Sequence, residues 1–140
     1  KSTKYPDTTM DMCEHTFTYA LYPHTGTLVE GGVIEESTAL NLPLTVSCGS
    51  PKNSSRIFTI EGNGVNVDAI KKAESEDCMI LRVHECFGGK THVKVGSEYG
   101  ITRYATCNLL EDRETEPVYG SAIEFDLKPF EIKTFMVWFS

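Results

Sequence analysis

Apolar and polar residues alternate along most of this chain, and the alternation predicts β-strands. Residues 64–95 hold the clearest example, GVNVDAIKKAESEDCMILRVHECFGGKTHVKV. Its middle part has the two-residue period of a strand, with Met79, Leu81 and Val83 facing one way and Ile80, Arg82 and His84 the other. A polar break at residues 74–77 and the pair Gly88-Gly89 mark two reversals, because glycine adopts the positive φ angles of tight turns. This segment therefore predicts a meander of three strands.

The same alternation predicts six further strands. They cover residues 14–22, 42–48, 56–61, 102–107, 122–128 and 131–139. A short helical turn is expected around residues 33–40. Turn residues recur at the spacing of about 8 to 12 residues that is typical of all-β sandwiches. The expected fold is an antiparallel β-sandwich of roughly eight or nine strands.

The last predicted strand is apolar on both faces where it reads Phe135-Met136-Val137-Trp138-Phe139. Such a strand is either central in its sheet or covered on one face by something outside this chain. The second possibility predicts a domain interface at Phe135, Val137 and Phe139. It also predicts that copies of the isolated chain associate through this face.

Composition narrows the class of partner. A chain of 140 residues with 40% hydrophobic residues suits one domain, and a net charge of -7 disfavours nucleic acid or an anionic membrane, which bind clustered Lys and Arg. No apolar run approaches the roughly 20 residues of a membrane span, and the first residues lack the apolar core of a signal peptide. Since the chain begins at Lys1 without Met, we expect Lys1 to be an internal position of a longer protein.

Candidate chemistry is sparse. The five cysteines form no C-x-x-C pair and lie within or beside apolar segments, which predicts a reducing compartment and small buried side chains. His84-Glu85 begins like a zinc protease motif, but Gly88 holds the place of the second histidine. The carboxylates cluster in turns instead of forming the facing pair that a glycosidase needs. The residues alone thus indicate an all-β module without a recognisable catalytic site.

Several phrases resemble a known family in their order along the chain. KYPD, EHTFTYALYPHTG, VDAIKKAE, ILRVHECFGG, NLLED and FDLKPFEIKTFMVWF are similar to the C-terminal β region of class II α-mannosidases of glycoside hydrolase family 38. H-x-F-T-Y-A-L-x-P-H together with the early Y-P-D looks most like the cytosolic and vacuolar branch. The chain departs from the family at His84-Glu85, where relatives often have Tyr-Glu before the glycines.

The resemblance implies a C-terminal fragment of a larger enzyme that hydrolyses terminal α-mannosides with retention of configuration. In this family the zinc ion, its ligands and the nucleophile belong to a preceding barrel, so neither catalytic residues nor zinc are expected in this chain. Residues 1–48 would be the exit strand and connection from a large β domain, and residues 49–140 the sandwich proper. Tyr5 and Asp7 would approach the catalytic face. The implied partners are the other domains and the oligosaccharide, in the cytoplasm or vacuole.

A different class of function stays open. An independent carbohydrate-binding module would need an exposed aromatic platform for stacking on sugar rings. The candidates are Tyr5, Tyr99, Tyr104, Tyr119 and Trp138. An adhesion or signalling sandwich rests on analogy of fold alone.

Overall fold

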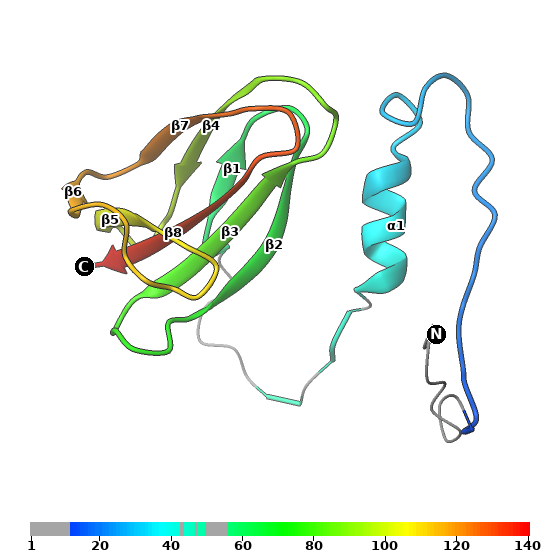
Figure 1. The fold of residues 1–140 in the computed structure, drawn as a ribbon, viewed down its shortest axis with the longest axis horizontal. Coiled ribbons are helices and arrows are strands. Elements are labelled where there is room, and N and C mark those ends of the chain that lie inside the picture. The colour runs from blue at the N-terminus through cyan, green and yellow to red at the C-terminus, as the bar shows by residue number, and fades with distance from the viewer. Residues whose placement is uncertain (1–11, 43, 47, 50–55) are drawn as a thin grey trace, which may run out of the picture. The chain divides into compact units, whose positions relative to one another are not determined.

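The computed structural model describes residues 12–42, 44–46, 48–49 and 56–140, and the chain divides into two compact units, Lys1–Leu40 and Asn41–Ser140. Figure 1 shows the ribbon with its labelled elements. The described residues form one helix, α1 (Val33–Asn41), and eight strands. The strands are β1 (Thr59–Glu61), β2 (Val65–Lys72), β3 (Met79–Glu85), β4 (Thr91–Gly96), β5 (Ile101–Cys107), β6 (Val118–Tyr119), β7 (Ile123–Leu127) and β8 (Ile132–Phe139).

The strands form two antiparallel sheets, and the predicted all-β sandwich is confirmed. One sheet has the order β1-β4-β7 and the other β2-β3-β8-β5-β6. In Figure 1 the five-stranded sheet faces the viewer and the smaller sheet lies behind it. The core between them is built by alternate residues of strands from both sheets, including Leu81, Val83, Val93, Val95, Ile123 and Leu127, which are buried.

The predicted three-strand meander is wrong in one connection. β2 pairs with β3, but β4 pairs with β1 and β7 in the other sheet. The turn between β3 and β4 therefore carries the chain from one sheet to the other. Gly88 has φ +77° there, as expected, whereas Gly89 is not among the described glycines with positive φ. The sequence period fixes which side chains share a face, but a period alone does not say which sheet a strand joins.

Strand β8 is central in the five-stranded sheet, between β3 and β5. Phe135 and Val137 lie in the core between the sheets. Met136 and Trp138 belong to a second buried cluster with Ile80 on the opposite face. The guanidinium of Arg103 lies 4.5 Å from the centroid of the Trp138 ring and so covers part of this face. The hypothesis that β8 has an uncovered apolar face is therefore wrong for these four residues, because both faces are covered from within the chain.

Two predicted strands are absent from the described residues. Residues 14–22 and the described part of residues 42–48 have no strand pairing. In the first segment Phe17, Tyr19 and Leu21 are largely exposed, and in the second Leu44 and Val46 are too. Alternation supplies a strand with two faces, but the backbone needs a neighbouring edge to pair with.

The predicted helical turn is confirmed and extends to Asn41 as α1. A capping arrangement precedes it, in which the Glu30 N–H donates to Thr27 Oγ1 (3.2 Å) and the Glu30 carboxylate accepts the Thr27 N–H (2.8 Å). Glu35 and Glu36 lie in the first turn, where the helix dipole favours negative charge. No residue of α1 is buried, so this helix builds no core of its own.

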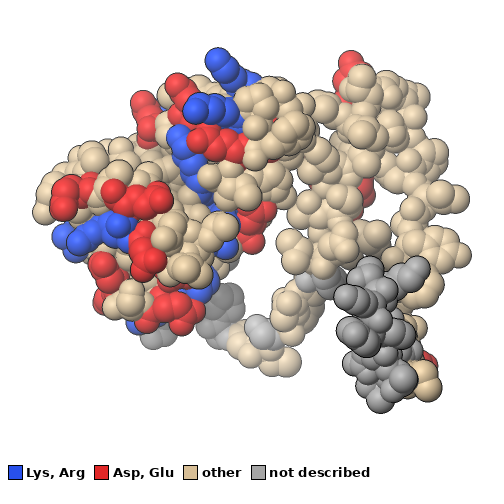
Figure 2. Space-filling model, in the orientation of Figure 1, with Lys and Arg blue, Asp and Glu red and all other residues tan. Residues whose placement is uncertain are grey.

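On the face of the sandwich that Figure 2 shows, Lys and Arg are interspersed with Asp and Glu. Within the described part of the chain, no helix is long and apolar enough to cross a membrane.

Candidate functional site

The turn between β3 and β4 is organised by Glu85, whose side chain is buried. Its carboxylate accepts the backbone N–H groups of Phe87 (2.8 Å), Gly88 (2.9 Å) and Phe130 (3.0 Å). The Glu85 N–H in turn donates to the carbonyl of Glu131 at 3.0 Å. One acidic side chain thus joins the β3–β4 turn to the β7–β8 turn, and we call this arrangement the Glu85 clamp.

Burial raises the pKa of the Glu85 carboxyl, but hydrogen bonds from Phe130, Gly89, Phe87 and Gly88 lower it by more, so the net shift is downward. Donors aimed at a carboxylate favour its charged form. Glu85 therefore stays ionised near neutral pH without a cationic partner. A general acid needs a raised pKa, so this shift runs against such a role.

A second acidic side chain, Glu111, holds the loop that follows β5. Glu111 is buried and has φ +69°. Its carboxylate accepts the backbone N–H of Glu74 (2.9 Å) and lies 2.8 Å from Lys71 Nζ. The hydrogen bond from Lys71 is the main reason that the pKa of Glu111 is lowered, followed by the Glu74 N–H. Glu111 thereby joins its loop to the β2–β3 turn.

Asn108 fixes the same loop from inside. Its Oδ1 accepts the backbone N–H groups of Leu110 (2.8 Å) and Asp112 (3.0 Å), and its Nδ2 donates to the Asp112 carboxylate (3.1 Å). These hydrogen bonds hold the backbone of the loop, and Leu109 and Leu110 at its tip are exposed.

A shallow groove lies on the outer face of the five-stranded sheet, between the loop held by Asn108 and Glu111 and the turns joined by the Glu85 clamp. Its volume is about 510 Å³. It is lined by Asp68, Arg82, His84, Glu85, Cys86, Leu109, Phe130 and Ile132, and we call it the outer groove. At its floor His84 Nδ1 lies 2.8 and 2.9 Å from the two oxygens of Asp68.

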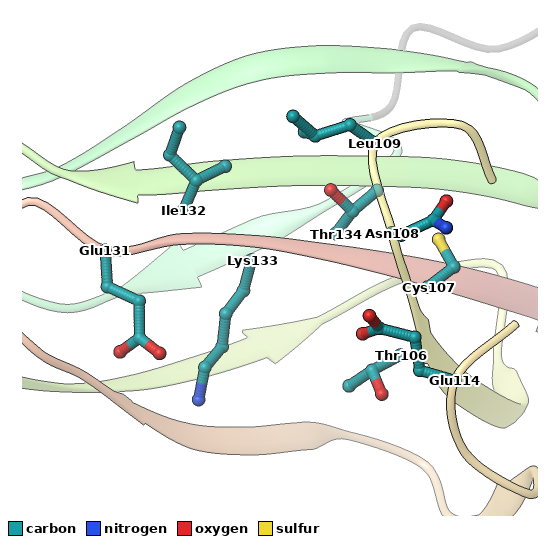
Figure 3. Close-up of a pocket in the computed structure, with 9 residues that line it drawn as sticks. All are labelled: Thr106, Cys107, Asn108, Leu109, Glu114, Glu131, Ile132, Lys133 and Thr134. Atoms are coloured by element: carbon teal, nitrogen blue, oxygen red, sulfur yellow. The ribbon is translucent and has the colours of Figure 1, made fainter. Parts of the chain in front are cut away.

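Another pocket lies where β5 and β8 meet the loop after β5, and its side chains do not converge. Figure 3 shows Glu131 and Glu114 at opposite ends, with Lys133 between them. Glu131 also accepts the Lys128 N–H at 2.7 Å and so closes the β7–β8 turn. This arrangement lacks two carboxylates that face each other across a cleft, as a glycosidase requires.

The described residues contain no group of three or more His, Cys, Asp or Glu that could hold a metal ion. Among the cysteines, the prediction of burial is confirmed for Cys78 and Cys107 and wrong for Cys13 and Cys48, which are exposed. Burial raises the pKa of Cys78 and Cys107 to about 11, so both are protonated thiols at neutral pH. Cys78 and Cys107 are therefore unreactive thiols whose role is packing in the second buried cluster.

The residues singled out from the sequence do not form one site. Tyr5 and Asp7 lie outside the described residues. Phe135 and Val137 are core residues, and Phe139 packs partly buried against that core.

The aromatic residues considered for a sugar platform are also separated or covered. Trp138 is buried and Tyr104 half-buried, whereas Tyr99 and Tyr119 are exposed. In the sequence, Glu85 stands out only as part of an apparent metalloprotease motif, and Phe130 does not stand out as a candidate functional residue. The signal for Phe130 was Pro129-Phe130-Glu131, a large apolar residue in the turn between two strands.

Residues 64–135, half of the chain, match the family described as "Glycosyl hydrolases family 38 C-terminal beta sandwich domain". The chain belongs to this family. The matched range begins at Gly64, whose carbonyl accepts the Cys86 N–H at 2.8 Å. It contains Glu85, Glu111 and the four turns and loops that these two side chains join. The expected resemblance to family 38 is thus confirmed, and the side chains that tie the loops of this family 38 sandwich together lie inside the matched range.

The curated proteins to which this chain is similar have names that agree with the family match. The chain is 35% identical to "Alpha-mannosidase G" of Dictyostelium discoideum, over 96% of this chain and 13% of that protein. It is 28% identical to "Alpha-mannosidase 2C1" of Mus musculus, over 98% of this chain and 14% of that protein. With "Alpha-mannosidase" of Saccharomyces cerevisiae the identity is 24%, over 99% of this chain and 15% of that protein. The chain therefore spans about one seventh of the length of these relatives.

Proposed function

We propose that this chain is the non-catalytic C-terminal accessory domain of an α-mannosidase that hydrolyses terminal α-mannosides. One observation carries the proposal: the chain aligns over almost its whole length with proteins named alpha-mannosidase, yet covers only 13 to 15% of them. A segment of that share has the size of one domain in a multidomain enzyme.

The geometry of the acidic residues supports a structural role. Retaining glycosidases use two carboxylic groups about 5 Å apart on either side of the scissile bond. In this sandwich the buried carboxylates Glu85 and Glu111 are occupied by backbone N–H groups of neighbouring loops. We assign the chemistry, and the zinc that the family resemblance implies, to another domain of the same polypeptide.

Residues 1–48 are, in this proposal, the exit strand and connection from a preceding β domain, and residues 49–140 are the sandwich. The exposure of the alternating residues Phe17, Tyr19 and Leu21 supports this assignment, because an unpaired amphipathic segment gains stability when it joins a sheet edge. Tyr5 and Asp7 would then lead toward the catalytic face. The proposed partners are the enzyme's own remaining domains and its oligosaccharide substrate, in the cytoplasm or the vacuole.

The test compares the 140-residue chain with the longer polypeptide that contains it. The longer protein should hydrolyse an aryl α-mannoside and lose this activity on zinc chelation, whereas the purified chain should show none. The coding sequence before Lys1 should encode a barrel with His and Asp zinc ligands. Zinc-dependent turnover by the chain alone, or a coding sequence without such a barrel, would refute the proposal.

A further inference from the structure

The outer groove combines an apolar rim with flanking loops that are held by hydrogen bonds. Its rim consists of Leu109, Phe130 and Ile132, which are 61%, 70% and 53% exposed. Leu109 stands on the loop fixed by Asn108 and Glu111, and Phe130 stands on the turn fixed by the Glu85 clamp. Large apolar side chains held in fixed positions in water are typical of a surface that another surface covers.

Phe130 is the most informative of these residues. Its φ of +58° lies in the left-handed region, which costs a bulky residue about 1 to 3 kcal/mol and suits glycine. The ring adds little to the stability of the fold, because most of it is in water. Its tip lies near Gly88. A phenylalanine in such a position is better explained by a contact outside the sandwich than by folding.

The polar groups in the groove have partners already. His84 and Asp68 bind each other, Arg82 Nε donates to Thr134 Oγ1 at 3.1 Å, and Arg82 Nη2 donates to the Leu109 carbonyl at 3.1 Å. A sugar is recognised largely through its hydroxyl groups, and these paired groups leave few directed hydrogen bonds for them. An apolar side chain gains from the rim without needing such bonds.

We propose that the outer groove docks an apolar side chain from another domain of the same mannosidase polypeptide, seated between Phe130, Ile132 and Leu109. The inference rests on the proposed function. Relatives aligned with this chain are about seven times its length, so a domain of this kind has most of its potential contacts within its own polypeptide. A tethered partner is favoured over a separate protein because its effective concentration is high.

The experiment is hydroxyl-radical footprinting of the intact polypeptide, with each side-chain rate divided by its rate in the denatured protein. If the groove is occupied, Phe130 and Leu109 should react at least tenfold more slowly than their exposure in the 140-residue structure implies. Ile132→Lys should restore fast reaction at both residues, since it places a charge in the contact. Phe130→Gly should do the same at Leu109, and its relaxed backbone makes loss of folding a poor explanation.

Val118→Lys is the matched control. Val118 is β-branched, lies on a strand and is 51% exposed, close to the 53% of Ile132, but it does not line the groove. It should leave the rates at Phe130 and Leu109 unchanged. Low rates at the core residues Val93 and Leu81 in every variant would show that the sandwich is folded.

Three results would overturn the inference. Phe130 and Leu109 could react fast in the intact wild-type protein, or their protection could vanish on dilution, which would indicate a second copy. Their protection could instead require added methyl α-mannoside, which would indicate a sugar site. In each case an active, zinc-dependent intact enzyme would leave the proposed function standing, whereas an inactive one would refute both.

Discussion

Strand β8 and residues 14–22 are both predicted from the sequence as strands, and the structure treats them in opposite ways. Val137 in β8 is completely buried, whereas Leu21 in the second segment is 94% exposed. β8 has hydrogen-bonded neighbours on both sides, β3 and β5, and the described residues offer residues 14–22 none. Alternation thus predicts which side chains share a face, whereas their burial requires a sheet edge and a covering layer that other segments supply.

A charge placed in each region gives the largest expected contrast. Val137→Lys puts an unpaired ammonium between the sheets and should cost more than about 4 kcal/mol in the free energy of unfolding, whereas Leu21→Lys should change it by less than about 0.5 kcal/mol. Urea unfolding followed by the fluorescence of Trp138, the single tryptophan, measures both. Equal stability of the two variants would contradict the difference in burial between Val137 and Leu21.

The exit-strand proposal sharpens this contrast. In the intact polypeptide Leu21→Lys should become destabilising by about 1 to 3 kcal/mol, because the segment would then be paired and its apolar face buried. The measurement is the unfolding midpoint of the longer protein with and without the change. A neutral outcome there would mean that residues 14–22 stay exposed in the enzyme too.

Glu85→Gln should have the next largest effect, a loss of about 1 to 3 kcal/mol of stability. Glutamine keeps one acceptor oxygen, but its NH2 group would face the N–H of Phe87, Gly88 or Phe130. Glu124→Gln is the control, since Glu124 is half exposed and forms an exposed ion pair with Lys94. Denaturant unfolding of both variants measures the difference, and similar stabilities would show that the clamp contributes little.

Acid should destabilise the sandwich through the same carboxylates. The pKa of Glu111 is lower in the folded chain than its ordinary value of 4.5, so its stabilising contribution is complete above that value and is lost as pH falls through the lowered pKa. Glu111→Gln should therefore reduce the drop in unfolding midpoint between pH 6 and pH 3. An unchanged drop would mean that Glu111 does not contribute to acid sensitivity.

The thiols distinguish the regions without altering the fold. Cys13 and Cys48 are exposed and should react with a thiol reagent at pH 8 at least tenfold faster than Cys78 and Cys107, whose burial and raised pKa both oppose thiolate formation. Mass spectrometry of the native protein after timed labelling gives the rates. Comparable rates at all four would contradict the packing of the second buried cluster.

Candidate chemistry was harder to predict than the strands, and particular residues show why. His84-Glu85 begins like a metal motif, yet Glu85 binds three backbone N–H groups and His84 binds Asp68. Both residues line the outer groove, but each side chain is occupied by partners that its place in the sequence does not reveal. That Glu85 would meet Phe130, 45 residues away, could not be read from local spacing.

The local pattern of residues was enough to predict the all-β class, the alternate faces of β3 and the family resemblance, because periodicity and ordered phrases are local properties of the chain. Tertiary structure alone decided that β4 leaves the sheet of β3, that β8 is covered on both faces and that residues 14–22 are unpaired. It also decided that Leu109, Phe130 and Ile132 meet around one groove. These outcomes depend on which distant segments come together, and hydrogen-bond pairing and side-chain packing between such segments leave no periodic signal in the sequence.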